Sequence, residues 1–209
     1  GQELTDRLLE QIVPFAPQWH LGEQASVLAP QPNGGFLVET SSGTQLHARA
    51  VFIAAGVGAF LPRALKLPGL EAFEGTQLRY GLDEGENLAG QHLVVHGGGE
   101  HAVATAITCA TAPEHLRPSR VTLHHRRDVF DAPPAVLDQL RVLRVAGRIE
   151  VAIGVASGIE QAAGHLSALM LTTSEGKLLR VPLDRLLVRL GLVPRLGPIA
   201  DWDMALERK

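Results

Sequence analysis

The segment His92-Leu-Val-Val-His-Gly-Gly-Gly-Glu-His-Ala-Val-Ala-Thr-Ala-Ile-Thr-Cys109 determines how the rest of the chain is interpreted. Its apolar residues 93–95 predict a buried strand, its three glycines predict a tight turn, and the Ala-rich residues from Glu100 onward predict a helix. A strand, a glycine turn and a helix in that order form the opening of a βαβ nucleotide-binding unit.

Each small residue of the motif has a predicted role. In the G-x-G-x-x-G/A pattern, Gly97 would make the turn, Gly99 would let the backbone approach a pyrophosphate, and Ala102 would let helix and strand pack closely. The new helix N-terminus adds unpaired N–H groups and a positive dipole end, which suit a phosphate anion. A glycine pattern alone is weak evidence, so the interpretation depends on the rest of the chain. The other candidate binding residues in this turn are Gly98, Glu100 and His101.

A second candidate site follows the next predicted strand, residues 121–124. Proteins that bind NAD usually place an acidic residue there to accept hydrogen bonds from the ribose 2′-OH, whereas this chain has His125, Arg126 and Arg127. Guanidinium groups offer paired, charge-assisted donors that suit a 2′-phosphate. An isolated basic pair is more often a solvated turn, so the inference rests on its position one βαβ step after the glycines. We therefore predict NADPH as the bound nucleotide, with NADH as the alternative.

Composition excludes several other classes of function. The chain has 209 residues, is 45% hydrophobic and carries a net charge of -3, which gives no reason to expect nucleic acid or a membrane surface as a partner. Its one cysteine, Cys109, cannot form an intramolecular disulfide or a Cys-x-x-Cys redox pair, and we interpret it as a core residue. No apolar run approaches the roughly 20 residues that span a bilayer, and no signal peptide is visible, so we expect a cytoplasmic protein.

The nine histidines have no convincing metal-binding spacing. His92 and His96 lie on a predicted strand rather than on one helix face, and the adjacent His124 and His125 would point to opposite sides of a strand. The sequence has no Gly-x-Ser-x-Gly nucleophile motif either. We therefore predict no metal ligand and assign no catalytic acid or base.

The N-terminal part predicts a helix and a meander. Residues 3–13 have the pattern of an amphipathic helix that ends before Pro14, and turn signals at residues 32–35 and 41–43 separate strand-like stretches. These strand-like stretches cover residues 18–28, 36–40 and 44–53. The last of them ends as Val51-Phe-Ile-Ala-Ala-Gly56, which predicts a buried strand running into a glycine.

The C-terminal part predicts a helix and further short strands. Prolines and glycines in residues 56–75 mark a domain crossing. A helix should begin near Pro133, and residues 183–190 fit a helix or a strand, whereas residues 191–198 predict a loop. The chain has no initiator Met, and we expect it to be a fragment of a longer protein. Four further strands are expected at residues 149–153, 155–160, 166–172 and 177–181.

Several motifs in a fixed order resemble one family over essentially the whole chain. They are Val51-Phe-Ile-Ala-Ala-Gly56, Leu67-Pro-Gly-Leu-Glu71, Arg79-Tyr-Gly-Leu-Asp83, Gly97-Gly-Gly-Glu-His-Ala102 and His125-Arg-Arg-Asp-Val-Phe130. The sequence resembles the thioredoxin-reductase-like FAD/NAD(P)-binding flavoproteins. The closing stretch at residues 190–202 resembles in particular the ferredoxin/flavodoxin–NADP reductases of that group.

This resemblance implies an α/β fold in which one domain is inserted into another. A Rossmann-like NAD(P)-binding domain, a βαβ unit with a small β-meander, would occupy residues 79–182. It would interrupt a partial FAD-binding domain made of residues 1–78, with a helix and a three-stranded β-meander, and of the return segment 183–209. Ala54, Ala55 and Gly56 would lie at the FAD, with Ala55 where the family usually has Thr.

The resemblance also implies an activity. Members pass hydride from NADPH through FAD to an electron acceptor such as ferredoxin or flavodoxin. The family's N-terminal FAD fingerprint and C-terminal Gly-Asp segment are not in this sequence, so we expect the chain by itself not to hold FAD and to be inactive. Dimers are common in the family, which makes a homodimer an expectation as well.

Two residues depart from the family's nucleotide-binding motifs. His101 replaces a small Ser and should crowd the phosphate turn, while Asp131 replaces an Arg and should repel a 2′-phosphate. An alternative function is therefore a divergent nucleotide-binding module without turnover.

Overall fold

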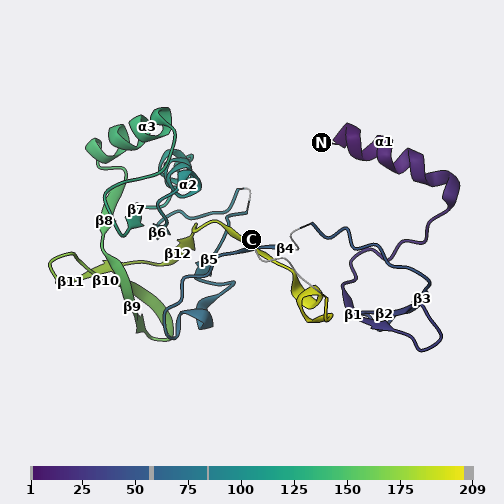
Figure 1. The fold of residues 1–209 in the computed structure, drawn as a ribbon. Coiled ribbons are helices and arrows are strands. Elements are labelled where there is room, and N and C mark those ends of the chain that lie inside the picture. The colour runs from purple at the N-terminus through teal and green to yellow at the C-terminus, as the bar shows by residue number, and fades with distance from the viewer. Residues whose placement is uncertain (1, 57–58, 84, 205–209) are drawn as a thin grey trace. The chain divides into compact units, whose positions relative to one another are not determined.

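A computed structural model describes residues 2–56, 59–83 and 85–204 of the chain (Figure 1). The chain divides into two compact units, one made of residues 1–59 and 195–209 and the other of residues 60–194. We call them the meander unit and the sheet unit, and each is described by itself.

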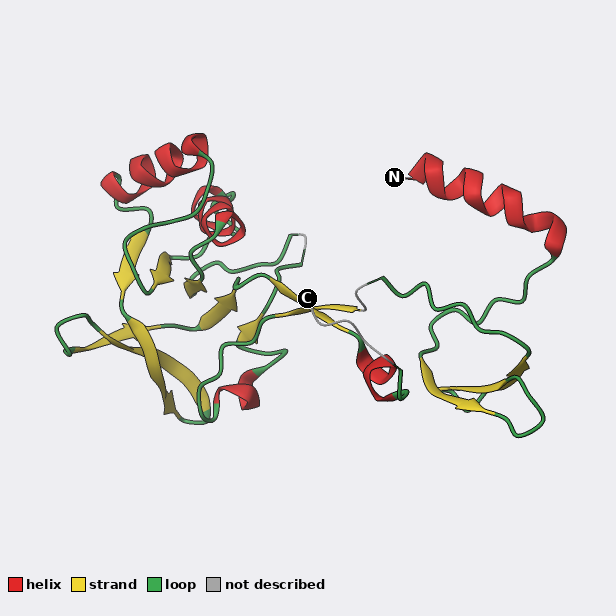
Figure 2. Cartoon of the chain, in the orientation of Figure 1, coloured by secondary structure: helices red, strands yellow, loops and turns green. Residues whose placement is uncertain are grey.

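The sheet unit is built on a parallel five-stranded sheet in the order β5-β12-β6-β7-β8. Figure 2 draws the strands of the chain in yellow and its helices in red. All four neighbouring pairs in this sheet are parallel. Two helices, α2 (Glu100–Thr111) and α3 (Pro134–Val145), connect β6 to β7 and β7 to β8. The strands are β5 (Leu78–Arg79), β6 (His92–His96), β7 (Arg120–His125), β8 (Glu150–Ile153) and β12 (Arg185–Val188).

The apolar run of β6 is buried on both faces of the sheet. Leu93 and Val95 pack into one core cluster with Ala102 of α2, while Val94 belongs to a second cluster with Leu169. A strand covered on both sides has to be apolar at successive positions, which explains the unbroken run at residues 93–95. Cys109 lies in the first cluster, where burial raises its pKa to about 11, and this confirms it as a core residue.

A second, antiparallel sheet supplies the other core cluster. Its strands, in the order β11-β10-β9, are β9 (Val155–Ala162), β10 (His165–Thr172) and β11 (Leu178–Pro182). The 3-10 helix η2 (Leu70–Phe73) also belongs here, because Leu70 and Phe73 are buried in that cluster. The ambiguous residues 183–190 contain a strand, β12, because residues 186–188 are buried by both clusters.

The loop predicted for residues 191–198 is wrong in part. Residues Leu192–Arg195 form β13, which pairs with β4 (Ala59–Pro62) in a two-stranded sheet, and the 3-10 helix η3 (Gly197–Asp201) follows. The glycines and prolines of residues 191–198 indicate local turns. They do not indicate that residues 192–195 pair with β4, which lies far earlier in the sequence.

The meander unit contains a helix and a three-stranded antiparallel sheet. The helix α1 (Gln2–Ile12) is followed by the 3-10 turn η1 (Val13–Phe15) and by the sheet β1-β2-β3. The strands are β1 (Ala25–Pro30), β2 (Phe36–Thr40) and β3 (Gln45–Ala48). The three-stranded meander is therefore present, but its first strand begins at residue 25 rather than 18.

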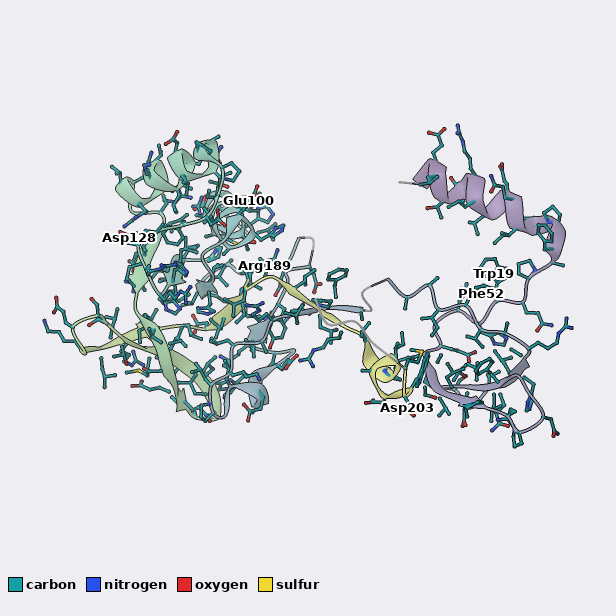
Figure 3. The ribbon with its side chains drawn as sticks, viewed as in Figure 1. Trp19, Phe52, Glu100, Asp128, Arg189 and Asp203 are labelled. Carbon is teal, nitrogen blue, oxygen red and sulfur yellow. The ribbon has the colours of Figure 1, made fainter. Side chains whose placement is uncertain are left out.

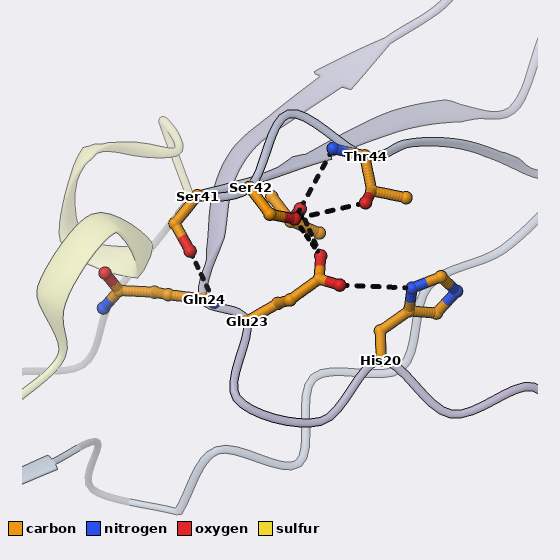
Figure 4. Close-up of polar contacts among 7 residues, drawn as sticks. His20, Glu23, Gln24, Ser41, Ser42 and Thr44 are labelled. Atoms are coloured by element: carbon orange, nitrogen blue, oxygen red, sulfur yellow. Dashed lines mark hydrogen bonds and ion pairs between the residues drawn. The ribbon is translucent and has the colours of Figure 1, made fainter.

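A carboxylate fixes the turn between β2 and β3 (Figure 4). Glu23 accepts hydrogen bonds from the hydroxyls of Ser42 and Thr40, both at 2.5 Å, and lies 3.7 Å from the ring of His20. These hydroxyls, Ser42 first, lower the pKa of Glu23 to about 2. The residues before β1 are held to the turn by these side-chain contacts and by the N–H of Ser41, which donates to the carbonyl of Gln24 at 2.7 Å, and residues 18–24 lie outside the strand.

The buried strand predicted for residues 51–56 is not present. These residues have no strand pairing among the described part of the chain, and the Phe52 side chain is 95% exposed (Figure 3). A strand needs a hydrogen-bonding neighbour, and an apolar sequence by itself does not provide one.

The boundaries of the compact units differ from the predicted domain boundaries. The sheet unit begins at residue 60 rather than 79, because the connector packs its apolar residues Leu70 and Phe73 into that unit's core. Residues 205–209 of the predicted return segment lie outside the described residues. The assignment of the two units to FAD and NADP remains a prediction.

Candidate nucleotide-binding site

The predicted strand, glycine turn and helix are all present in the sheet unit. β6 ends at His96, Gly99 precedes α2, and its carbonyl accepts hydrogen bonds from the N–H groups of Ala102 and Val103 at 3.0 and 3.2 Å. Gly99 has no side chain to bond the first N–H groups of the helix, so they remain available to an anion.

The three glycines differ in how much space surrounds them. A Cβ on Gly97 would lie 2.5 Å from the carbonyl oxygen of Arg189 and 2.8 Å from the Cβ of Ala102, and its φ is +155°. A Cβ on Gly98 would overlap the imidazole of His125, whereas a Cβ on Gly99 would meet no atom within 4 Å. Gly97 is therefore required by packing, and Gly99 is the one that borders open space.

The basic turn after β7 folds over the glycine turn. The backbone N–H of Asp131 donates to the carbonyl of Gly98 at 2.8 Å, and the ring of Phe130 lies 5.7 Å from that of His125. His125 in turn donates from Nδ1 to the carbonyl of Arg127 at 2.9 Å. These contacts bring the two predicted sites together.

The two turns share a cavity of about 460 Å³, which we call the glycine-turn cavity. Its lining brings together six of the predicted binding residues, namely Gly98, Gly99, Glu100, His101, His125 and Arg127. Gly97 and Ala102 are buried beneath the turn, and the exposed Arg126 does not line the cavity. The remaining lining residues are Val129, Phe130, Asp131, Arg189, Leu190 and Gly191.

The charges around this cavity are mixed. Arg126 and Arg127 are exposed and have no hydrogen bond or ion pair from their guanidinium groups within the described chain. The neighbouring Asp128 is already paired with Arg144, at 3.1 Å, so its charge is partly neutralised (Figure 3). Glu100 and Asp131 contribute negative charge to the cavity wall.

Arg189 is a site residue that the sequence did not indicate. It follows the last residue of β12, its N–H donates to the carbonyl of His96 at 2.7 Å, and its Nη1 donates to the carbonyl of Tyr80 at 2.8 Å. Its Nε is buried and has no hydrogen-bond partner among the described residues. The apolar pattern of residues 183–190 left even helix and strand undecided, so no sequence signal placed this side chain.

Two histidines form a buried pair where β6 and β7 end. His96 and His124 are stacked with ring centroids 4.6 Å apart, and their Nδ1 atoms are 2.7 Å apart. His124 donates from Nε2 to the carbonyl of Gly154 at 3.0 Å, so its Nδ1 accepts a hydrogen bond from the Nδ1–H of His96. Burial, followed by the charges of His124 and His125, lowers the pKa of His96 to about 3, and burial also lowers the pKa of His124.

This pair should make stability depend on pH. The unfolded chain takes up a proton on each histidine near pH 6.5, whereas folded His96 resists protonation until about pH 3, so stability falls as the pH decreases through this interval. We expect His96 to account for about 2 kcal/mol of lost unfolding free energy between pH 7 and pH 5. Urea unfolding at both pH values, followed by tyrosine fluorescence, measures this loss. A His96→Gln variant that shows the same loss would contradict the assignment.

Groups of three or more His, Cys, Asp or Glu arranged to hold a metal ion do not occur among the described residues. In the same part of the chain, no helix is long and apolar enough to cross a membrane.

The residues predicted to lie at FAD belong to the meander unit. Ala54 and Ala55 line an apolar cavity of about 370 Å³ together with Phe52 and Trp202, and Gly56 is exposed. The lining offers the amide of Gln24 but no charged side chain and no glycine turn before a helix. Within the described part of this unit, the lining of the cavity suits the apolar portion of a cofactor, and it offers no charged group for a pyrophosphate.

No family model matches the sequence. The chain is 49% identical to a protein named ferredoxin–NADP reductase from Verminephrobacter eiseniae and 50% identical to one from Paracidovorax citrulli. Both similarities cover the whole of this chain and 60% of the relative, so the chain spans about 60% of the length of these curated relatives.

Solved structures share the fold at low sequence identity. A thioredoxin reductase from T. acidophilum has a TM-score of 0.70 at 17% identity, over 99% of this chain and 64% of that one. A bacillithiol disulfide reductase from Staphylococcus aureus has a TM-score of 0.72 at 15% identity, over 96% and 58% of the two chains. The predicted α/β fold of the thioredoxin-reductase-like type is thereby confirmed.

Proposed function

The chain is homologous along its whole length to the ferredoxin–NADP reductases, and from this relationship we propose that it contributes the NADPH-binding part of an FAD-dependent oxidoreductase. This enzyme passes hydride from NADPH through flavin to a redox protein such as ferredoxin or flavodoxin. We further propose a cytoplasmic location and a homodimer, which rest on the resemblance alone.

The observation that carries the proposal is the shared cavity of the glycine turn and the basic turn. Gly99 borders open space at the start of a helix, and Arg127 lines the same cavity without a partner for its guanidinium group in the described chain. A helix N-terminus suits a pyrophosphate, and a guanidinium suits a 2′-phosphate. One cavity thus offers both kinds of anion site that NADPH requires.

The residues present fit NADPH better than they fit FAD. Gly97 to Ala102 would hold the pyrophosphate, and Arg126 with Arg127 would hold the 2′-phosphate, while His125 covers Gly98 and shapes the turn. FAD, when bound, supplies the acceptor for the hydride and passes electrons on. Ala54, Ala55 and Gly56 would border FAD, and we propose that the chain by itself does not retain it.

The experiment that tests the activity is an anaerobic titration with NADPH of the whole FAD-bound oxidoreductase to which this chain contributes. Bleaching of the flavin absorbance by one equivalent of NADPH, with a much slower response to NADH, is the expected result. Bound FAD that NADPH does not bleach would overturn the proposed activity.

Asp131 should weaken NADPH binding, because its carboxylate lines the cavity beside the glycine turn. Its contact with Gly98 is made by the backbone, so an Asp131→Asn change removes the charge and keeps that contact. We expect NADPH affinity to rise about three- to tenfold at low salt, and less at high salt, because exposed charges are screened. Calorimetry at low and at high salt measures the NADPH affinity of the variant and of the wild type. An unchanged affinity at low salt would show that Asp131 lies too far from the nucleotide.

The second candidate function is a nucleotide-binding module without turnover. Two residues favour it, since His101 and Asp131 both line the glycine-turn cavity where a small residue and a cation would serve better. Tight NADPH binding without any reduction of bound flavin would support this candidate over the oxidoreductase.

A further inference from the structure

Arg189 lies at the point in the parallel sheet where the strand order reverses: β7 and β8 follow on one side of β6, and β12 lies on its other side. β12 and β6 are neighbours although they are far apart in sequence, and Val188 is paired with His96 at the end of both strands. Arg189 and Gly97 are therefore the first residues beyond the paired ends. Ligands of open α/β sheets bind at the carboxyl ends of the strands at such a switch point.

The guanidinium of Arg189 is held from one side only. Its Nη1 donates to the carbonyl of Tyr80 at 2.8 Å, while the buried Nε has no partner and Nη2 has no hydrogen bond within the described residues. Nε and Nη2 form the edge of a guanidinium that binds an oxyanion through two parallel hydrogen bonds. Arg120 uses this same edge to bind Glu150 elsewhere in the unit, at 2.9 and 2.6 Å.

A buried donor without a partner is costly, because it loses its hydrogen bonds to water and gains none in return. Arg189 lines the glycine-turn cavity, and it also lines a smaller cavity of about 160 Å³ with Tyr80 and His101. If the Arg189 side chain turns its free edge into the glycine-turn cavity, an anion there would satisfy the buried Nε. The chemistry of the edge favours a phosphate oxygen pair.

The order of the strands indicates which phosphate this is. Arg127 lies after β7, the glycine turn lies after β6, and Arg189 lies after β12, and these three strands are neighbours in the sheet. If the adenosine 2′-phosphate lies at Arg127 and the pyrophosphate crosses the glycine turn, the nicotinamide half extends toward β12. We propose that Arg189 binds the phosphate of the nicotinamide half of NADPH. This inference rests on the proposed function.

Binding of two ligands distinguishes the proposed contact of Arg189 from the contacts of the adenosine half. NADPH contains both halves of the dinucleotide, whereas 2′,5′-ADP contains only the adenosine half with its two phosphates. Calorimetry with both ligands should show that Arg189→Gln lowers NADPH affinity about 10- to 100-fold and changes 2′,5′-ADP affinity less than twofold. By contrast, Arg127→Gln should weaken both ligands, and Arg141→Gln, on the exposed face of α3, should weaken neither.

Unchanged NADPH affinity in Arg189→Gln, or an equal loss for both ligands, would overturn the inference. Should that variant fail to fold by circular dichroism, Arg189→Lys decides, because Lys can still donate to the Tyr80 carbonyl but has no paired edge. Lys must then show the same selective loss, and unchanged affinity there overturns the inference. A wild-type chain that binds neither ligand would instead overturn the proposed function.

Discussion

Replacing Gly97 by alanine should destabilise the sheet unit by about 3 kcal/mol or more and abolish NADPH binding. The new methyl group would lie 2.5 Å from the carbonyl oxygen of Arg189, which is backbone, and 2.8 Å from the Cβ of Ala102, which is fully buried. Neither neighbour can move without separating β12 or α2 from β6. The backbone at Gly97, with φ at +155°, is also one that alanine rarely adopts.

A matched control lies two residues away in the same turn. A Cβ on Gly99 meets nothing within 4 Å, and its φ of −89° suits alanine, so Gly99→Ala should fold with nearly unchanged stability. If Gly99 lets the backbone approach a pyrophosphate, that variant should still lose NADPH affinity. Gly97→Ala therefore tests the packing of the turn, and Gly99→Ala tests its contact with the nucleotide.

The stability of the sheet unit can be followed selectively. The protein has one tyrosine, Tyr80, in the sheet unit, and its two tryptophans, Trp19 and Trp202, belong to the meander unit. Urea unfolding followed by tyrosine emission, recorded at wavelengths shorter than the tryptophan emission band, therefore reports mainly on the unit that contains Gly97. A Gly97→Ala variant as stable as the wild type would contradict the packing described for the turn.

Removing both arginines of the basic turn should nearly abolish the preference for NADPH over NADH. A hydrogen bond to a charged group contributes about 1.5 to 3 kcal/mol, so an Arg126→Gln and Arg127→Gln double variant should reduce the affinity ratio about tenfold or more. NADH has no 2′-phosphate, so its affinity should change little. The variant should fold normally, because both side chains are exposed.

Calorimetric titration of the double variant with each nucleotide measures that ratio. Arg141→Gln serves as the control, since Arg141 is an exposed arginine paired with Asp138 on α3. An equal fall in affinity for both nucleotides would show that the two arginines do not recognise the 2′-phosphate.

The sequence was most informative where local pattern and long-range packing agree. Residues 93–95, followed by three glycines and an Ala-rich run, predicted β6, the turn and α2, because a strand buried on both faces must be apolar throughout. The basic turn could be placed beside the glycines because consecutive parallel strands end at the same edge of a sheet.

The failures arose where structure depends on a distant segment. Residues 51–56 are as apolar as β6 but have no pairing partner among the described residues, and β13 forms only because β4 pairs with it. Arg189 reaches the cavity through the pairing of β12 with β6, which no local pattern contains. The connector likewise joins the sheet unit through the burial of Leu70 and Phe73 rather than through its turn residues.

The central claim is that the sheet unit recognises NADPH by its 2′-phosphate, and a calorimetric titration of this chain with NADPH and NADH tests it most directly. We predict that NADPH binds at least about tenfold more tightly than NADH, as expected from one or two guanidinium contacts. Equal affinity for the two nucleotides, or no binding of either, would contradict the claim.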